Sequence, residues 1–209
     1  MHRYSTDNDN YVKMLVGLTI VSAVFNAIIN IIIIPSLIKN NLFILLISLV
    51  LSYFITFELI FEIFDKLLWK FSVFNKFIKC PNISGKWKGT IDNHEFPKVN
   101  VDVEIKQSWT KISIKLQSKN AKSKTKALTF FVEDSDNPEI CYVYFNESTT
   151  KKLTSHGGTG ILTFLKDENR LVGYYYTDKH RENNGDIILE KIEDFSYLRK
   201  LKCCILNHI

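Results

Sequence analysis

Two apolar stretches, residues 14–34 and 42–60, constrain the fold of this chain more than any other feature. Each is about 20 residues long and almost free of charge, and at ~1.5 Å rise per residue such a helix crosses the ~30 Å hydrocarbon core of a membrane. Neither stretch has the polar face of a helix on a soluble protein. Only residues 35–41 separate them, so the second helix has to run back antiparallel to the first. We therefore predict a transmembrane hairpin of two helices, at about 14–34 and 42–60, within an N-terminal region of residues 1–79.

The charges that flank the hairpin predict which side of the membrane the chain ends face. The short connection carries Lys39 alone, whereas the outer flanks of the hairpin carry a larger group of basic residues: Arg3, Lys13, Lys66, Lys70, Lys76 and Lys79. Because basic residues near membrane spans stay in the cytoplasm, we expect both termini there. Residues 65–79 interleave lysines with aromatic residues, which is typical of an amphipathic segment in the membrane interface. Residues 1–10 are polar, and we expect them to be disordered.

The first apolar stretch contains two asparagines, Asn26 and Asn30, at a spacing of four residues. This spacing puts both side chains on one face of a helix. Asparagine is costly in lipid unless its amide finds a partner, so this face is expected to turn toward protein. The partner lies either inside the hairpin or in another copy of the chain. The second interpretation predicts a homo-oligomer that forms through the membrane helices.

After Pro81 the apolar residues alternate with polar ones, as they do in strands that have one face in water. The alternation and the turn-like segments predict eight strands, at about 83–92, 99–106, 112–117, 122–133, 140–147, 158–166, 171–177 and 186–192. Strands with one apolar face each must close or stack, and a closed barrel leaves no free edge. We predict an all-β domain over residues 80–194, a lipocalin-like, up-and-down antiparallel β-barrel, with a β-sandwich as the alternative. Residues 195–209 form a short tail with helical amphipathy.

The chain lacks the residue clusters that catalysis or metal binding requires. His94, His156 and His180 have no nucleophile motif around them. The glycine-rich residues 157–160 lack the Gly-Lys-Ser/Thr sequence and the helix of a phosphate loop. The four cysteines do not have the spacing of a zinc finger. We predict a binding protein with no enzymatic activity, no metal and no cofactor.

Aromatic and basic residues of the all-β region mark a candidate ligand site. Tyrosines alternate on two predicted strands, and a lysine and an arginine follow the second of them. The simpler alternatives are tyrosines that fill the barrel core and basic residues on a solvated surface. Flat rings stack on nucleotide bases, and guanidinium groups bind phosphates, so the two sets together suit a nucleotide. The candidate ligand-binding residues are Trp109, Tyr142, Tyr144, Tyr176, Lys179 and Arg181.

The order of these parts, a membrane hairpin followed directly by a minimal eight-stranded barrel, is uncommon. The barrel begins with Ile-Ser-Gly-Lys-Trp-Lys-Gly (83–89) and ends with Leu-Val-Gly-Tyr-Tyr (171–175) and Gly-Asp-Ile-Ile-Leu (185–189). Over its whole length the chain resembles the two-transmembrane β-barrel effectors of CBASS, the cyclic-oligonucleotide-based antiphage signalling systems of bacteria.

The resemblance implies a function. In such effectors, a nucleotidyltransferase that senses phage infection makes a cyclic dinucleotide, which the barrel binds. The protein then oligomerises through its membrane helices and disrupts the inner membrane, which kills the infected cell. The resemblance thus implies a multi-pass inner-membrane protein linked to a cyclic nucleotide synthase, with no DNA or RNA polymer as a partner. Two alternatives remain open: a membrane-tethered, lipocalin-like carrier of lipid, and a passive docking module for another protein.

Overall fold

The computed structural model describes residues 1–37, 42–93, 97–133, 136–148, 155–178 and 183–192. The chain divides into two compact units. The helical unit comprises Thr6–Asn82 together with Ser108–Lys111, and the barrel unit comprises Met1–Ser5, Ile83–Gln107 and residues from Ile112 onward. Each unit thus takes in a segment that the order of the sequence does not assign to it, namely the N-terminal five residues and a four-residue turn.

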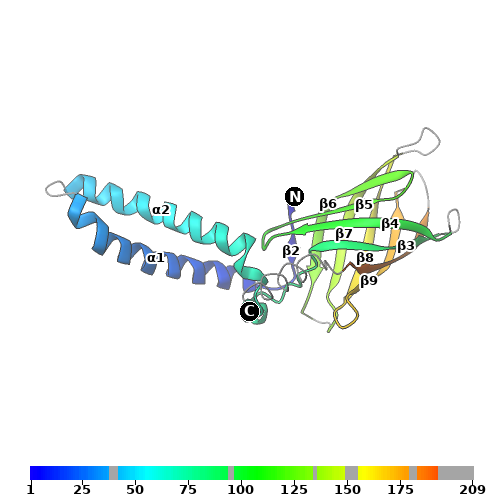
Figure 1. The fold of residues 1–209 in the computed structure, drawn as a ribbon, viewed down its shortest axis with the longest axis horizontal. Coiled ribbons are helices and arrows are strands. Elements are labelled where there is room, and N and C mark those ends of the chain that lie inside the picture. The colour runs from blue at the N-terminus through cyan, green and yellow to red at the C-terminus, as the bar shows by residue number, and fades with distance from the viewer. Residues whose placement is uncertain (38–41, 94–96, 134–135, 149–154, 179–182, 193–209) are drawn as a thin grey trace, which may run out of the picture. The chain divides into compact units, whose positions relative to one another are not determined.

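The helical unit is built on two long helices that run side by side (Figure 1), α1 (Asn10–Leu37) and α2 (Leu42–Lys66). A short 3-10 helix, η1 (Leu68–Lys70), and α3 (Ser72–Ile78) follow. Helix α1 begins earlier than the apolar stretch because the Asn8 Oδ1 atom accepts a hydrogen bond from the Asn10 N–H at 3.1 Å. It also continues two residues beyond Pro35, where the sequence predicted a loop. A proline ring disfavours helix in the residues before it, yet here the helix tolerates it near its end.

Both long helices expose apolar side chains over most of their surface, although α1 buries one stripe at Leu18, Ser22 and Asn26. Val16, Ile20 and Phe25 are more than half exposed, and Ile31 is 75% exposed. Two segments, Asn10–Ile32 and Ile47–Lys70, are long and apolar enough to cross a membrane, and only 17% and 11% of their most apolar windows are buried. A core helix of a soluble protein would bury most of such a surface. The predicted two-helix hairpin is therefore present, with its apolar surface free to contact lipid.

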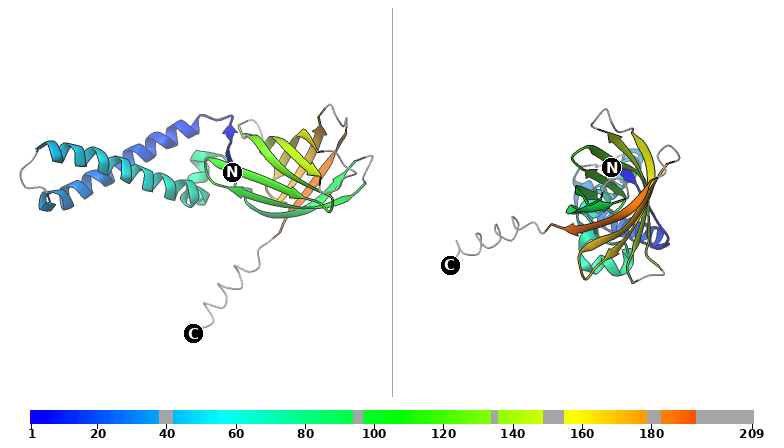
Figure 2. Two further views of the ribbon diagram at one scale, coloured as in Figure 1. Left: turned by 90° about the horizontal axis from the view of Figure 1, so that it is seen from above. Right: turned by 90° about the vertical axis from the view of Figure 1, so that its right-hand side faces the viewer.

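The barrel unit contains eight antiparallel strands, each paired with the next along the chain: β3 (Gly85–Asp92), β4 (Val99–Gln107), β5 (Lys111–Gln117), β6 (Ala121–Phe131), β7 (Glu139–Ser148), β8 (His156–Leu165), β9 (Arg170–Thr177) and β10 (Asn184–Lys191). In Figure 2 these strands curve around a common axis. Strand β10 pairs with β3, and β5 pairs with β6, so the sheet closes on itself. The predicted up-and-down barrel is confirmed.

Alternation along the strands places one side chain of every two inside the barrel. On β4, for example, Val101, Val103 and Ile105 are buried, while Asp102 between them is exposed. At the end of the barrel where β3 begins, Trp87 is fully buried and its indole N–H donates to the Ile83 carbonyl oxygen at 3.0 Å. Buried apolar side chains form the core at this end of the barrel.

The barrel has one weak seam, between β5 and β6. These strands pair over only three residue pairs, from Lys115–Lys124 to Gln117–Lys122. Two short N-terminal strands cover what remains of the two edges, β1 (His2–Arg3) on β5 and β2 (Ser5–Thr6) on β6. Side chains support this pairing: His2 Nε2 lies 2.9 Å from Thr125 Oγ1, and Ser5 Oγ lies 2.8 Å from Thr129 Oγ1. The expectation that residues 1–10 are disordered was wrong, because their polar groups satisfy an open sheet edge.

Candidate ligand-binding site

A cavity of about 170 Å³ opens at the end of the barrel where β3, β5, β7 and β9 end and the strands after them begin. Its lining divides into three groups. The apolar group is Ile91, Val99, Leu116 and Ile187; the aromatic group is Tyr142, Tyr144 and Tyr175; the polar group includes Asn93, Asn146, His156, Thr177 and Asn183. The opposite end of the barrel holds the buried side chains around Trp87, so among the described residues the cavity opens at this end.

Two glycines of β8 make room for the tyrosine rings of β7. In the antiparallel register Tyr142 lies opposite Gly160, and Tyr144 lies opposite Gly158. A Cβ atom on Gly160 would lie 2.4 Å from Tyr142 Cζ, and one on Gly158 would lie 2.4 Å from the Tyr144 hydroxyl oxygen. The rings therefore lie across the backbone of β8, where any side chain would displace them. The sequence placed these glycines at the start of a strand, but their role in seating the rings was missed.

The polar groups of the cavity are held by short hydrogen bonds. The Asn93 side-chain amide donates to the Tyr175 hydroxyl at 2.6 Å. The Thr177 hydroxyl donates to the Asn183 carbonyl at 2.9 Å and accepts from the Asn183 N–H at 2.7 Å. These contacts fix the ends of β9 and β10 on one side of the mouth. Hydrogen bonds within the protein thus hold these polar groups of the rim.

Tyr142 differs from its neighbours in the surroundings of its hydroxyl. Burial raises the pKa of Tyr142 above its ordinary value, and the nearby Tyr175 adds to the shift. As a neutral phenol, Tyr142 can donate a hydrogen bond. None of the hydrogen bonds of the described residues involves this hydroxyl, and the Tyr142 ring lines the cavity. A donor of this kind in an apolar site discriminates strongly for a ligand that supplies an acceptor.

The charge in the described lining is positive. Lys119 in the β5–β6 turn is its one charged side chain, and no carboxylate is among the described lining residues. Lys179 and Arg181, which the sequence analysis selected as phosphate contacts, lie outside the described residues. The segment that carries them joins Asp178 to Asn183, and Asn183 lines the cavity.

The structure separates the predicted aromatic residues into two groups. Tyr142 and Tyr144 line the cavity, as their alternation on one strand predicts. Tyr176 faces outward and is 50% exposed, because the buried residues of β9 are Leu171 and Tyr175. The ring that joins Tyr142 and Tyr144 is therefore Tyr175, whose centroid lies 6.4 Å from that of Tyr144. The sequence offered one signal for this: Leu171 is expected to be buried, and residue 175 lies on the same face of the strand as residue 171.

Trp109 does not belong to the cavity. It lies in the β4–β5 turn, which forms part of the helical unit, and its ring stacks on Tyr11 at 4.8 Å and meets Phe64 edge-on at 5.0 Å. Aromatic neighbours from both long helices thus bury Trp109, so it is a packing residue and lies outside the cavity. The attachment of this turn to the helices was not evident from the sequence.

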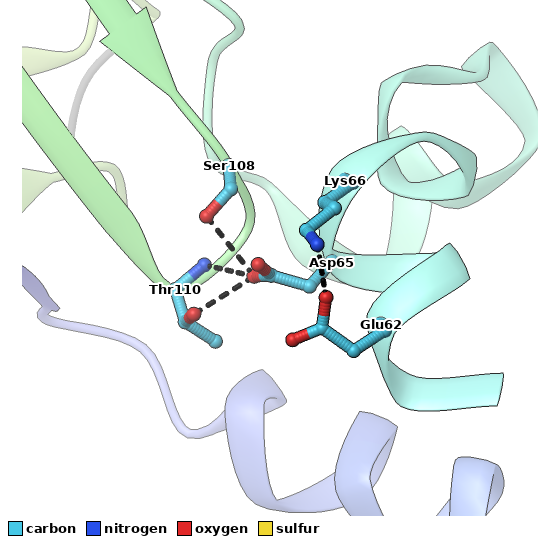
Figure 3. A network of polar contacts seen from close by, with 5 residues as sticks. All are labelled: Glu62, Asp65, Lys66, Ser108 and Thr110. Atoms are coloured by element: carbon cyan, nitrogen blue, oxygen red, sulfur yellow. Dashed lines mark hydrogen bonds and ion pairs between the residues drawn. The ribbon is translucent and has the colours of Figure 1, made fainter. Parts of the chain in front are cut away.

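The same turn is tied to α2 through a buried carboxylate (Figure 3). Asp65 Oδ1 accepts hydrogen bonds from the Thr110 N–H at 2.7 Å, the Thr110 hydroxyl at 2.8 Å and the Ser108 hydroxyl at 3.1 Å. The Asp65 carbonyl oxygen accepts a fourth bond from the Trp109 N–H at 3.0 Å. Nearby Glu62 and Lys66 form an exposed ion pair on the helix surface. Asp65 was not singled out from the sequence, because its donors come from more than 40 residues further along the chain.

The two asparagines of α1 have different surroundings. The Asn30 side-chain amide donates to the Asn26 carbonyl at 2.8 Å and to the Ser52 hydroxyl of α2 at 3.3 Å, so it bonds inside the hairpin. The Asn26 Oδ1 atom is buried and has no hydrogen-bond partner among the described residues. The Asn30 amide thus finds its partner inside the hairpin, which was the first of the two interpretations of this spacing. A contact between copies of the chain stays a prediction.

Comparison with known proteins connects this geometry to a family. Residues 78–191 match the family model described as Cap15, cyclic dinucleotide receptor domain. Two proteins named CD-NTase-associated protein 15 are similar to this chain, one from Yersinia aleksiciae and one from Staphylococcus schleiferi. Each is 29% identical over 136 residues, which is 62% of this chain and 64% and 71% of the respective relative. The match thus spans less than two thirds of the first relative's length.

The matched segment covers the whole barrel, from the end of α3 to the end of β10. It also includes every strand that lines the cavity. The resemblance to the membrane effectors of CBASS, inferred from the order of the parts, is confirmed at the level of the family. Because the match extends over more than half of the sequence, the chain belongs to the Cap15 cyclic dinucleotide receptor domain family.

Proposed function

We propose that this protein is a membrane-tethered receptor for a cyclic dinucleotide and acts as an effector of CBASS antiphage defence. The observation that carries the proposal is the coincidence of the family match, residues 78–191, with a barrel that has an open, aromatic-lined cavity. The same chain carries two helices that expose apolar side chains over most of their surface. A cyclic nucleotide synthase is then the protein that supplies the ligand.

The cavity suits one half of a cyclic dinucleotide. At about 170 Å³ it is smaller than the roughly 300 Å³ at which pockets for whole drug-sized ligands begin. We therefore place one base inside, stacked on the rings of Tyr142, Tyr144 and Tyr175, where each ring can contribute ~1–3 kcal/mol of stacking. The phosphates then lie at the mouth, near Lys119 and Asn183, and Lys179 and Arg181 stay the predicted phosphate contacts. The amides of Asn93 and Asn146 face the base edge.

The lipocalin-like alternative receives no support from the cavity. A carrier of fatty acids or other lipids needs a deep apolar lumen, as in the larger eight-stranded barrels that hold a ligand. Here the packed core around Trp87 fills the other end of the barrel, and Asn93, Asn146 and Thr177 stand in the lining.

Activation requires that the ligand bind one state of the protein more tightly than another. In this proposal the two states are dispersed hairpins and an oligomer that disrupts the bacterial inner membrane, with both termini in the cytoplasm. The buried Asn26 Oδ1 atom supports such a change, because in the single chain it leaves an acceptor unsatisfied that another copy can satisfy. Asn30 contributes by holding the two helices of each hairpin together through Ser52.

Calorimetry on the full chain in lipid nanodiscs tests the receptor function. Cyclic di-GMP, cyclic di-AMP, cyclic di-UMP, their linear counterparts and a fatty acid are titrated in parallel. At least one cyclic dinucleotide is expected to release heat with a stoichiometry of one per barrel, and its linear form is expected to bind more weakly. Heat from the fatty acid alone would establish the lipocalin-like alternative instead.

Co-expression separates an effector from a passive docking module. The full chain is expressed with a cyclic dinucleotide synthase whose product binds in the calorimetric test. We expect growth to arrest only when both proteins are present. Unchanged growth, with binding intact, would favour a docking role.

A further inference from the structure

The outer surface of the barrel divides into two halves of different chemistry. Outward positions on β3 to β6 are mostly charged: Lys86, Lys88, Asp102, Glu104, Lys106, Lys111, Lys115, Lys122 and Lys124. Outward positions in the middle of β7, β8 and β9 carry no charge. Six of them form what we call the tyrosine wall: Val143, Phe145, Thr159, Ile161, Tyr174 and Tyr176.

The strand register makes the tyrosine wall continuous. Val143 lies opposite Thr159, which lies opposite Tyr176, and Ile161 of the neighbouring row lies opposite Tyr174. Neighbouring strands are ~4.8 Å apart, so these side chains are next to one another across the rows. The rings of Tyr174 and Tyr176 are 5.5 Å apart. Val143, Phe145, Tyr174 and Tyr176 are 39–50% exposed. Water therefore contacts an apolar, aromatic surface, which is bordered by Lys126, 5.8 Å from the centre of the Phe145 ring, and by Asp186 of β10, opposite Tyr174.

The size of the wall indicates what covers it. Four side chains of this size, each nearly half exposed, offer roughly 300–400 Å² of apolar surface. A stable contact between two freely diffusing proteins buries about 800 Å² on each partner, so this wall is too small for a dimer in solution. Two copies anchored in one membrane meet at an effective concentration in the ~mM range, at which a weak contact is sufficient. An anionic lipid surface would select the lysine-rich half instead.

We propose that the tyrosine wall is the surface through which the barrels of two copies pair, wall against wall. A twofold contact brings the same patch of each copy together, so aromatic side chains meet aromatic side chains and the lysine-rich halves face away from each other. The inference rests on the proposed function for its trigger, but the surface itself is defined without a ligand.

Strand β9 connects the wall to the ligand cavity. Tyr175 lines the cavity, and its neighbours Tyr174 and Tyr176 stand on the wall. The hydroxyl of Tyr144, which lines the cavity as well, donates to the Tyr176 carbonyl oxygen at 3.4 Å. A ligand that fixes the rings of Tyr144 and Tyr175 therefore also fixes the backbone that carries the wall.

Site-specific crosslinking of the full chain tests the pairing. Thr159→Cys stands at the centre of the wall, and Ser113→Cys stands at an outward position of β5, in the lysine-rich half. Both are made in a background of Cys141→Ser, Cys203→Ser and Cys204→Ser. The proteins are placed in vesicles at rising density, with and without the cyclic dinucleotide that binds in calorimetry, and treated with a short bismaleimide. We expect dimers from Thr159→Cys, at least fivefold more than from Ser113→Cys, and more again with ligand.

Charge substitutions supply the second measurement. Thr159→Lys is expected to lower ligand-dependent assembly in nanodiscs by about tenfold while calorimetric affinity stays within about twofold, because the residue faces away from the cavity. The matched Ser113→Lys is expected to change neither quantity.

The outcomes separate this surface from the proposed function. If crosslinking at Thr159→Cys rises with protein density but does not change with any cyclic dinucleotide, pairing through the tyrosine wall is supported and the proposed receptor function is contradicted. If a cyclic dinucleotide binds but Thr159→Cys and Ser113→Cys crosslink equally, pairing through the tyrosine wall is contradicted and the proposed receptor function stands. If maleimide labels Thr159→Cys only after removal of residues 193–209, the tail of the same chain covers the wall, and pairing between copies is excluded.

Discussion

Among single residues, the unpaired hydroxyl of Tyr142 makes the sharpest prediction. Tyr142→Phe keeps the ring on Gly160 but removes the hydroxyl donor from the cavity. A hydrogen bond of this kind contributes about 1 kcal/mol, so we expect roughly a fivefold loss of cyclic dinucleotide affinity in calorimetry. Tyr176→Phe is the matched control, because its hydroxyl belongs to an outward-facing ring. Equal affinities for the two variants would remove Tyr142 from the site.

The glycine opposite Tyr142 gives a second prediction, which separates affinity from stability. In Gly160→Ala the new Cβ atom meets only the outer atoms of the Tyr142 ring, which can swing into the cavity. We expect weaker ligand binding with a small change in the thermal midpoint. In Gly173→Ala the Cβ atom would lie 1.9 Å from the Ile161 carbonyl oxygen, which is backbone, so the barrel itself is destabilised. Thermal unfolding alongside calorimetry distinguishes the two, and an unaltered affinity of Gly160→Ala would contradict the seating of the ring.

The alternation of single residues predicted part of the site. It failed on the strand where the sequence was compatible with either set of alternate residues facing the cavity. The alternation on β7 identified Tyr142 and Tyr144 as sharing a face, and both line the cavity. Three consecutive tyrosines on β9 fit either face, and the face was chosen wrongly. Polar pairs such as Asn93–Tyr175 join residues more than 80 positions apart, so no local pattern reveals them.

At the scale of elements, Asp65 fastens the β4–β5 turn to the end of α2. Asp65→Ala leaves the Thr110 N–H and two hydroxyls without their acceptor, so we expect a loss of about 2–3 kcal/mol of stability. The fluorescence of Trp109, which packs in the same turn, reports the unfolding of this region. Asp102→Ala is the matched control, because the Asp102 side chain is 74% exposed and its contact with Lys88 is long, at 4.0 Å. A midpoint equal to that of the control would show that the turn is held by apolar packing alone.

The membrane helices carry the next prediction. Asn26→Leu removes the buried acceptor that lacks a partner in the single chain. Since a hydrogen bond between helices in lipid is worth roughly 1 kcal/mol, we expect ligand-driven assembly to fall about fivefold while ligand affinity is unchanged. Thr19→Val is the control, because the Thr19 hydroxyl donates to the Leu15 carbonyl of its own helix. Assembly of the Asn26 variant at the level of this control would assign the asparagine to packing within the hairpin.

Elements with a strong period were predictable, and those that depend on distant partners were not. The two apolar stretches and all eight strands follow from composition and alternation. Strands β1 and β2 are two residues each and exist only because the β5–β6 seam leaves edges open. The β4–β5 turn joins the helical unit through Asp65 and Trp109, which no turn propensity encodes.

For the whole molecule, the central claim is that occupation of the open end of the barrel changes how the hairpins associate in a bilayer. The most direct measurement is dye release from vesicles that contain the full chain, made with ligand occupancy recorded on the same sample. We predict no release without ligand, release that rises with occupancy, and a shift of the whole curve to higher ligand concentration in Tyr142→Phe. Full occupancy with the dye retained would contradict the account.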